Sequence, residues 1–236
     1  MKSGDLEQLS DKNKRAWDQL YGCTEGVIWG ERVVGFLENF RDNVESGLDR
    51  VEGKKQILDA AGGEGRNLPW LLSLRPENTQ VTLCDASKAA LEKMTRRYAD
   101  AVQSVSCALD QTGFEDGRFH FILLSDVAET LPDIAGVLRE MYRILSSGGR
   151  LLCNVPDETD GIAGIDMKEI EKGKYLYRGQ YFYQFLERKD FLKMVEEIGF
   201  RLVEDAVVEW EEDTHPEFRE GKHWHRSPVY LLEKSL

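Results

Sequence analysis

The segment that most constrains this chain covers residues 56–65, where a short apolar run ends near Asp59 and passes into a glycine-rich turn. A second apolar run, residues 81–84, is closed by Asp85, which stands twenty residues after Gly65. Glycine lets a backbone approach a ligand that a side chain would block. An acid at the tip of the next strand can accept hydrogen bonds from both ribose hydroxyls. Together these features predict a pocket for a cofactor that carries adenosine.

The glycines do not complete the fingerprint of dinucleotide-binding proteins, G-x-G-x-x-G. Gly63 and Gly65 occupy the first two places, but Leu68 stands in the third, where a glycine would let the helix pack closely beside a pyrophosphate. A nicotinamide or flavin cofactor is therefore disfavoured, and the lack of a G-x-x-x-x-G-K-S/T run disfavours a phosphate-binding P-loop. For the glycines taken alone, a tight turn without a ligand is the alternative.

Four segments, in their order and spacing, resemble the class I S-adenosylmethionine-dependent methyltransferases. Residues 57–65 are similar to motif I of that family, an apolar strand followed by D-x-x-G-G-x-G. Residues 81–87 are similar to its ribose-binding strand end, and residues 119–126 to its fourth strand. Residues 138–152 are similar to the helix, tight turn and fifth strand that the family usually carries as R-x-L-x-P-G-G. The resemblance implies an enzyme that uses S-adenosylmethionine.

The sequence departs from this family pattern at three positions. Ala61 stands where the family often has its first glycine, Ser147 replaces the proline of P-G-G, and His120 stands where an aspartate commonly follows the phenylalanine. An alanine fits the first glycine position when the backbone there has a negative φ.

A second resemblance lies in the N-terminal part of the chain. Residues 17–21, Trp-Asp-Gln-Leu-Tyr, and residues 28–31, Ile-Trp-Gly-Glu, are similar to motifs of the small methyltransferases grouped with the tellurite-resistance and thiopurine enzymes and with type 11 methyltransferases. Residues 65–67 also match that subgroup. There the N-terminal segment covers the bound cofactor, which implies that Tyr21 and Trp29 lie at the cofactor site. The alternative is that the tryptophans pack at the edge of the core.

The resemblance implies a role for each residue of the cofactor site. Gly63 and Gly65 would let the amino-acid end of the cofactor lie against the backbone, and Asp59 would hold the loop. Asp85 would accept from the ribose hydroxyls. Asp110 would accept from the adenine amino group, with a solvated turn residue as the alternative. The full predicted set is Tyr21, Trp29, Asp59, Ala61, Gly63, Gly65, Asp85, Ala86, Leu109, Asp110 and Ser125.

From residue 56 onward the chain alternates between apolar runs and amphipathic patterns, which predicts an α/β fold. We expect a Rossmann-like, doubly wound sheet of seven mostly parallel strands. Its last strand should be antiparallel, because no helix separates it from the strand before. The predicted strands are residues 56–60, 80–84, 102–109, 119–125, 150–155, 200–210 and 229–233. The predicted helices cover residues 6–21, a segment from near residue 31, and residues 66–74, 87–101, 134–145 and 188–198.

The length is typical of a single α/β domain with elaborations, so we expect one domain over residues 1–236. Residues 1–50 would form an N-terminal helical cap, and residues 51–155 the cofactor-binding core. Residues 188–236 would add a helix and the antiparallel strand pair. Residues 156–187 would be an insertion rich in Tyr and Phe. It would form either an apolar lid over the substrate or an element packed on the sheet.

Three of the four histidines, His215, His223 and His225, fall in an expected loop between the last two strands. That loop faces the site if the sixth strand is parallel. An H-x-H pair near Glu can bind metal, but the spacing matches no standard site, and we predict no metal. A base or substrate-lining role is the second interpretation, and a hydrogen-bonded loop is the third. His223 and His225 are the candidates for a catalytic base.

Composition narrows the partners. The net charge of −12, from 31 Lys and Arg against 43 Asp and Glu, disfavours a nucleic-acid substrate. The first seven residues lack the apolar core of a signal peptide, and no apolar run approaches membrane-spanning length. The four cysteines form no C-x-x-C pair, so a cytoplasmic protein with reduced thiols is expected. The oligomeric state stays open.

These observations predict S-adenosylmethionine-dependent methyl transfer to a small molecule by in-line displacement. Such a transfer needs mainly alignment and a dry pocket. It needs a base only if the acceptor must lose a tightly held proton. The alternatives are a cofactor-binding protein without turnover, a methyltransferase that acts on protein or RNA, and a nicotinamide-dependent reductase.

Overall fold

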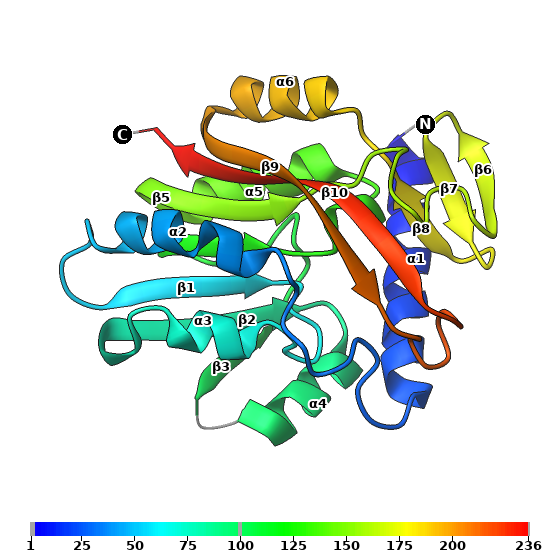
Figure 1. The fold of residues 1–236 in the computed structure, drawn as a ribbon, viewed down its shortest axis with the longest axis horizontal. Helices are drawn as coiled ribbons and strands as arrows, with labels where there is room; N and C mark the ends of the chain where they lie inside the picture. The colour runs from blue at the N-terminus through cyan, green and yellow to red at the C-terminus, as the bar shows by residue number, and fades with distance from the viewer. Residues whose placement is uncertain (1–2, 99–100, 236) are drawn as a thin grey trace.

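The central element is a seven-stranded sheet, whose strands run across the middle of Figure 1, from β9 and β10 above to β2 and β3 below. The computed structural model describes residues 3–98 and 101–235. The strand order is β3-β2-β1-β4-β5-β10-β9, in which β10 runs antiparallel to both β5 and β9. The other hydrogen-bonded pairs are parallel, so the predicted fold class is confirmed. The strands are β1 Lys55–Ala60, β2 Thr79–Asp85, β3 Val102–Ser106, β4 Phe119–Leu124, β5 Leu145–Asn154, β9 Phe200–Glu212 and β10 His223–Lys234.

Helices cover both faces of this sheet, because successive side chains of a strand point to opposite sides. They are α1 Ser3–Cys23, α2 Arg41–Leu48, α3 Leu68–Ser73, α4 Lys88–Tyr98, α5 Ile134–Ile144 and α6 Arg188–Ile198, with short 3-10 helices η1 Leu37–Phe40, η2 Pro76–Asn78 and η3 Ala128–Thr130. In β1, Leu58 belongs to the core cluster that includes side chains of α5 and α6. Its neighbour Ile57 belongs to the cluster that includes side chains of α2, α3 and α4. The two clusters produce the doubly wound arrangement.

The helix α5 shows how local sequence forms one of these elements. Asp133 caps its N-terminus by accepting a hydrogen bond of 2.9 Å from the backbone amide of Gly136, a contact that typically stabilises a helix by about 1 kcal/mol. Val137, Leu138 and Met141 then recur at helical spacing and are buried against the sheet. The predicted helix over residues 134–145 is therefore confirmed.

The second predicted helix begins later than expected. Residues 31–36 are irregular, and helical structure starts with η1 at Leu37. The reason is tertiary. The Arg66 guanidinium donates to the backbone oxygen of Arg32 at 2.8 Å, and the Asn67 side chain accepts from the amide of Val34 at 3.2 Å. These contacts use backbone groups that a helix starting at residue 31 would need.

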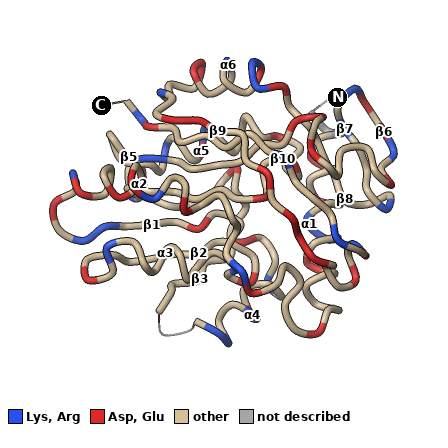
Figure 2. Tube along the Cα trace, viewed as in Figure 1, with Lys and Arg blue, Asp and Glu red and all other residues tan. Residues whose placement is uncertain are grey.

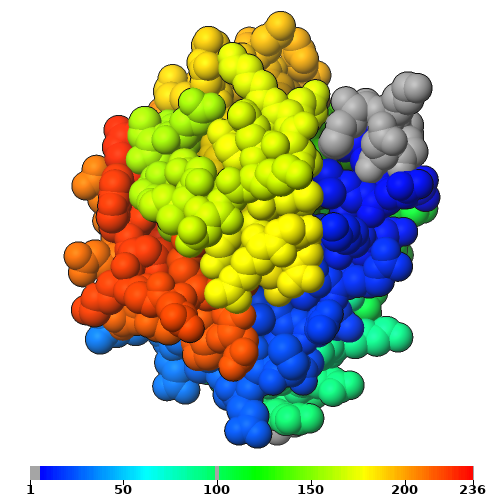
Figure 3. Space-filling view, turned by 90° about the vertical axis from the view of Figure 1, so that its right-hand side faces the viewer, coloured from blue at the N-terminus to red at the C-terminus, as the bar shows by residue number. Residues whose placement is uncertain are grey.

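The insertion at residues 156–187 forms a separate three-stranded antiparallel sheet, whose strands are β6 Met167–Glu171, β7 Lys174–Tyr177 and β8 Tyr181–Gln184. Figure 3 shows this sheet, in yellow and yellow-green, lying across α1 in blue and beside the end of β10 in red. Tyr177, Tyr181 and Tyr183 pack in one cluster with Leu20 of α1 and with Phe218. Those aromatic side chains therefore attach the insertion to the N-terminal helix.

The last two strands are longer than the sequence predicts. β9 continues to Glu212, and β10 begins at His223, six positions before the predicted start at residue 229. Near their distal ends β9 and β10 pair only with each other among the described strands, because β5 pairs with β10 from Val229 onward. The two strands form a two-stranded ribbon that reaches toward α1 (Figure 1). His223 and His225 are therefore strand residues, which corrects the expectation of a loop.

The surface charge is mixed. Figure 2 shows acidic and basic positions interspersed along most elements in that view. Within residues 3–98 and 101–235, none of the helices combines the length and the apolar character that crossing a bilayer requires.

Candidate functional site

A central cavity opens where the parallel strands end at their carboxyl termini. It is lined by the turns after β1, β2, β3 and β4, by α1 and by the distal β9–β10 ribbon. Ligands of open α/β sheets bind at this edge. Of the predicted site residues, those that line the cavity are Tyr21, Trp29, Asp59, Ala61, Gly63, Asp85, Ala86, Leu109, Asp110, Ser125, His223 and His225.

Gly65 is the exception, because it does not line the cavity. A Cβ at this position would lie 2.6 Å from Cδ1 of Leu68 and 3.1 Å from Cγ of Met94. Gly65 also has a φ of 85°, a conformation that favours glycine. The glycine therefore serves the packing of the turn against α3 and α4, and its contact with a cofactor stays a prediction.

Gly63 faces the cavity with its backbone exposed to a ligand. A Cβ there would lie 2.5 Å from the hydroxyl oxygen of Tyr21. That hydroxyl accepts a hydrogen bond of 2.7 Å from Nε1 of Trp29. Burial, and then the nearby Asp85 carboxylate, raise the pKa of Tyr21 well above its usual range, so the phenol stays neutral. The two N-terminal aromatic residues thus hold one wall of the cavity against the glycine turn.

Ala61 adopts a φ of 55°, so its backbone does not have the negative φ that suits an alanine. The conformation follows from the turn that it begins. The next amide, that of Gly62, donates to the backbone oxygen of Cys84 on β2 at 3.2 Å. A left-handed backbone costs a residue with a Cβ about 1 kcal/mol, and the contact between the two strand ends maintains it here.

Asp85 holds the glycine turn and the start of α4 together. Its Oδ2 accepts from the amide of Gly63 at 2.9 Å, and its Oδ1 accepts from the amide of Ser87 at 2.8 Å. Burial raises the pKa of Asp85 to about 6, although these amides act in the opposite direction. Each carboxylate oxygen keeps a further lone pair that can accept another hydrogen bond. Asp85 can therefore accept from a ligand without giving up its contacts to the chain.

Asp59 is almost fully buried, and its Oδ2 has no hydrogen-bond partner in the described structure. Burial and the Asp85 carboxylate raise its pKa to about 7. A Cβ on Gly62 would lie 2.6 Å from this carboxyl group, so glycine is needed there. The Ser125 hydroxyl is likewise buried without a partner. Buried polar atoms of this kind usually have partners, and these two line a cavity where a polar ligand would supply them.

Glu129 lines the cavity but was not predicted as a site residue. Glu129 in η3 is buried, its Oε2 has no partner, and burial followed by the Asp126 carboxylate raises its pKa to about 8. Asp126 has a φ of 54° and is held by Asn154, which accepts from its amide at 2.7 Å and donates to its Oδ1 at 2.7 Å. In the sequence, the position of Asp126 and Glu129 just after β4 could have indicated that they lie at the cavity. The burial of Glu129 could not be foreseen in this way, because it comes from packing of η3 against the inserted sheet.

The distal ribbon brings the histidines to the cavity. His225 stacks on Trp210 with ring centroids 5.0 Å apart, and its Nδ1 lies 3.3 Å from the carboxylate of Asp160. Burial lowers the pKa of His225, but the hydrogen bond and charge of Asp160 more than offset this and leave it raised. The pKa of His223 is lowered to about 4, chiefly by burial.

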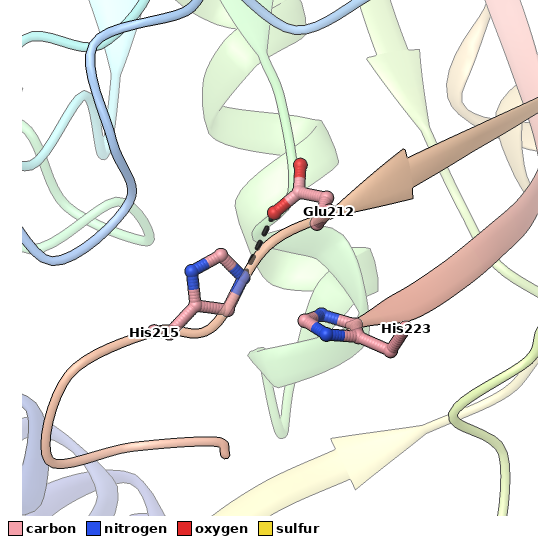
Figure 4. Close-up of side chains that lie close together, drawn as sticks. All are labelled: Glu212, His215 and His223. Carbon is pink, nitrogen blue, oxygen red and sulfur yellow. Dashed lines mark ion pairs between the residues drawn. The ribbon is translucent and has the colours of Figure 1, made fainter. Parts of the chain in front are cut away.

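His215 lies next to this pair, and Glu212 joins the cluster from the end of β9. The Nε2 of His215 is 2.8 Å from Oε2 of Glu212, as Figure 4 shows, with His223 beside them. The Arg66 guanidinium donates to Oε1 of the same glutamate at 2.7 Å. These contacts bring together residues that the sequence placed in one loop and residues of the glycine turn.

Comparison with known proteins identifies the family. Residues 36–205 match the family model described as a methyltransferase domain. The chain belongs to this methyltransferase family. The matched region of this methyltransferase contains the carboxyl ends of the parallel strands and the inserted sheet. The helix α1 and the three histidines of the distal ribbon lie outside it.

Two curated relatives are similar to this methyltransferase. It is 26% identical over 166 residues to the ubiquinone/menaquinone biosynthesis C-methyltransferase UbiE of Brucella anthropi. This alignment covers 62% of this chain and 63% of that protein. It is 26% identical over 218 residues to the arsenite methyltransferase of Rattus norvegicus. This second alignment covers 86% of this chain and 52% of that protein. The chain spans less than two thirds of the length of either relative.

Among solved structures, the 1,6-didemethyltoxoflavin-N1-methyltransferase of Burkholderia thailandensis has a TM-score of 0.67 at 16% identity. The match covers 98% of this chain and 91% of that one. At this identity the likeness shows a shared fold. That structure holds 1,6-didemethyltoxoflavin and S-adenosylhomocysteine. The prediction of a class I methyltransferase, a class whose methyl donor is S-adenosylmethionine, is confirmed by the family match and the fold.

Proposed function

We propose that this methyltransferase transfers a methyl group from S-adenosylmethionine to a small-molecule acceptor in the central cavity. The observation that carries the proposal is the pairing of Asp85 with the amide of Gly63 at 2.9 Å. It sets a carboxylate and an exposed backbone turn side by side at the cavity, where the ribose and the amino-acid end of the cofactor would lie.

The chain offers a partner for each part of this cofactor. Asp85 would accept from the ribose hydroxyls, and Leu109 and Asp110 would meet the adenine. The unpartnered Oδ2 of Asp59 suits the cationic ammonium of the amino-acid end, because a charged ligand would repay the cost of burying a carboxyl group. Gly63, Ala61 and Ala86 would supply the close backbone approach, while Tyr21 and Trp29 would close the wall.

The acceptor side is lined by Ser125, Asp126, Glu129 and the distal ribbon. When bound, the cofactor supplies an electrophilic methyl group on sulfur, so the residues of the chain have to align the acceptor and exclude water. The aromatic rings of Trp17, Trp29 and Phe218 lie within 6.0 Å of one another, centroid to centroid, and provide an apolar boundary. We retain the lid interpretation for the inserted sheet, since Tyr183 of β8 also lines the cavity.

A base is available where the acceptor needs one. Of the two predicted candidates, His225 is held in the better arrangement, because Asp160 faces its Nδ1 and leaves Nε2 free. This arrangement matches the pairing by which a carboxylate orients a catalytic imidazole. His223 faces the backbone oxygen of Gly221 and has no carboxylate at its Nδ1. We therefore assign the base role to His225.

Purified protein tests the cofactor assignment directly. Thermal unfolding should be shifted upward by S-adenosylmethionine and by S-adenosylhomocysteine, and not by NAD. A ligand present at about a hundred times its Kd adds about 2.7 kcal/mol. A shift with NAD alone would support the reductase. A shift with S-adenosylmethionine, but no conversion to S-adenosylhomocysteine with panels of phenol, amine, thiol and carbon acceptors, would favour a binding protein without turnover.

The remaining alternatives concern the partner. The charge of −12 and the interspersed charges argue against a nucleic-acid acceptor. A protein or RNA acceptor would be identified if the enzyme methylates the macromolecules of a lysate and not the small molecules of that lysate. We also keep the proposal of a cytoplasmic location, which the four free cysteines support.

A further inference from the structure

We propose that Glu212, His215 and His223 bind a divalent transition-metal ion at the edge of the central cavity. One ligand atom from each residue lies within 4.8 Å of the others, and all three side chains line the cavity. Figure 4 shows the carboxylate of Glu212 facing the ring of His215, with the ring of His223 beside them. Two imidazoles and one carboxylate are a common set of protein ligands for zinc and for non-haem iron.

The backbone selects the nitrogen that each histidine can offer. Nδ1 of His215 lies 3.3 Å from the carbonyl oxygen of Ile28, and Nδ1 of His223 lies 3.3 Å from the carbonyl oxygen of Gly221. A neutral ring carries one N–H, and a carbonyl oxygen can only accept. The tautomer with the proton on Nδ1 satisfies each carbonyl oxygen and leaves Nε2 to present a lone pair. Metal-binding histidines are typically oriented by such a hydrogen bond from the other ring nitrogen.

With this tautomer, the short contact between Nε2 of His215 and Glu212 needs an explanation. Its Nε2 lies 2.8 Å from Oε2 of Glu212. With the proton on Nδ1, a lone pair would face a carboxylate oxygen unless the ring carries a second proton. A cation between the two atoms removes this conflict. Ligands bound at about 2.0–2.2 Å on neighbouring positions of one ion stand roughly 3 Å apart, so the present separation needs little change.

The contacts of Glu212 leave its Oε2 available as a metal ligand. Its Oε1 accepts from Arg66 at 2.7 Å and from Nε1 of Trp210 at 3.0 Å. These two donors engage Oε1 and fix the plane of the carboxylate, and Oε2 is left toward the histidines. The positive charge of Arg66 opposes a second cation. The half-buried carboxylate of Asp126 and the buried carboxylate of Asp160, on the other hand, line the same cavity and favour one.

The strand register brings the ligands together, which explains why the sequence spacing did not reveal the site. His223 pairs directly with Glu212 across the β9–β10 ribbon. His215 is placed by the short turn after β9, where its amide donates to the backbone oxygen of Arg219 at 2.8 Å. The three ligands are thus held by backbone pairing rather than by a flexible loop, and preorganised ligands favour binding.

Metal binding is tested on tag-free full-length protein that has been treated with a chelator and dialysed. Titration calorimetry with Zn²⁺ should give one site per chain. Co²⁺ should give a visible absorption band that Zn²⁺ displaces. Glu212→Gln and His223→Asn should each weaken Zn²⁺ binding at least tenfold, and His223→Asn can keep the contact to Gly221 through its side-chain amide. Unchanged thermal unfolding of either variant without metal shows that it folds.

Two matched controls decide the assignment. His120→Asn, at the start of β4 and away from the cavity, should bind Zn²⁺ like the wild type. His225→Asn, which removes the nearest other histidine, should retain the site within a few-fold. Absence of stoichiometric binding by the wild type would overturn the proposal. So would Zn²⁺ binding that survives both Glu212→Gln and His223→Asn, or binding that depends on His120. None of these readouts requires methyl transfer.

Discussion

Asp85 and Gly63 are joined by a hydrogen bond of 2.9 Å from the backbone amide of Gly63 to Oδ2 of Asp85. The bond connects the end of β2 to the turn that follows β1, so the acid expected at the ribose and the glycine expected beside the amino-acid end are parts of one structure. A change at either residue should therefore affect cofactor binding through the same contact.

Asp85→Ala should weaken binding of S-adenosylhomocysteine about tenfold to a hundredfold, because a hydrogen bond to a charged group contributes about 1.5–3 kcal/mol. Titration calorimetry measures the loss. Glu197→Gln removes an exposed acid of α6 and should leave the affinity unchanged. Equal affinities for Asp85→Ala and the wild type would show that the ribose is bound elsewhere.

Gly63→Ala should abolish measurable cofactor binding. The new Cβ would lie 2.5 Å from the Tyr21 hydroxyl at a φ of 54°, so the turn or the aromatic wall would have to move. Gly53→Ala is the matched control, because Gly53 has a φ of 74° and nothing within 4 Å of a Cβ. Both variants carry backbone strain of about 1 kcal/mol, yet only Gly63→Ala should lose the cofactor. If the two variants bind equally, the glycine turn is not the binding surface.

Ala61→Gly should stabilise the protein by about 0.5–1 kcal/mol. The left-handed φ of 55° is strained for alanine but not for glycine. The free energy gained by relieving this strain exceeds the cost of the additional conformational entropy that glycine loses on folding. Urea unfolding measures the difference. Ala60→Gly, one residue earlier in β1, should destabilise by a similar amount, because its backbone is extended and its side chain is buried. A loss of stability in both variants would contradict the strain at Ala61.

Glu129 should make stability fall as pH rises. Burial raises its pKa from 4.5 to about 8 in the folded protein, so between pH 5 and pH 8 the unfolded chain releases this proton more readily than the native state. The native state then binds more protons, and the free energy of unfolding decreases with pH. Glu129→Gln should lose less stability than the wild type when urea unfolding is compared at pH 5.5 and pH 8.

Glu140 provides the control of opposite sign. Its hydrogen bond with Arg143 is the largest cause that lowers its pKa to about 2, so its contribution is present above about pH 4.5 and is lost only as the pH falls toward 2. Glu140→Gln should therefore lower stability by the same amount at pH 5.5 and pH 8. A wild-type pH slope that is unchanged by Glu129→Gln would mean that Glu129 ionises normally in the folded state.

The sequence was most informative where function depends on local order along the chain. The glycine turn after Asp59, and Asp85 at the end of the next strand, could be located from short apolar runs and their spacing. The alternation of strands and helices then placed both at one edge of a parallel sheet, because carboxyl ends of parallel strands meet there. Family, fold class and the residues of the turns after β1 and β2 followed from that local information.

Residues 31–36 and Ala61 show where local patterns were insufficient. Apolar spacing predicted a helix near residue 31, but Arg66 and Asn67 take up its backbone groups from another part of the chain. An alanine at position 61 is favoured at negative φ, but the contact of the next amide with β2 imposes a left-handed turn. In both cases tertiary hydrogen bonds outweighed preferences of about 1 kcal/mol.

The sequence by itself located the glycine turn and Asp85 at the carboxyl edge of the parallel strands, because strand ends and turn glycines are set by neighbours along the chain. Only the tertiary structure decided the opposite wall. The register of β9 with β10 brings His223 across from Glu212, and packing against the inserted sheet buries Glu129. Strand register and burial are set by contacts between residues far apart in the chain, and no spacing along the sequence encodes them directly.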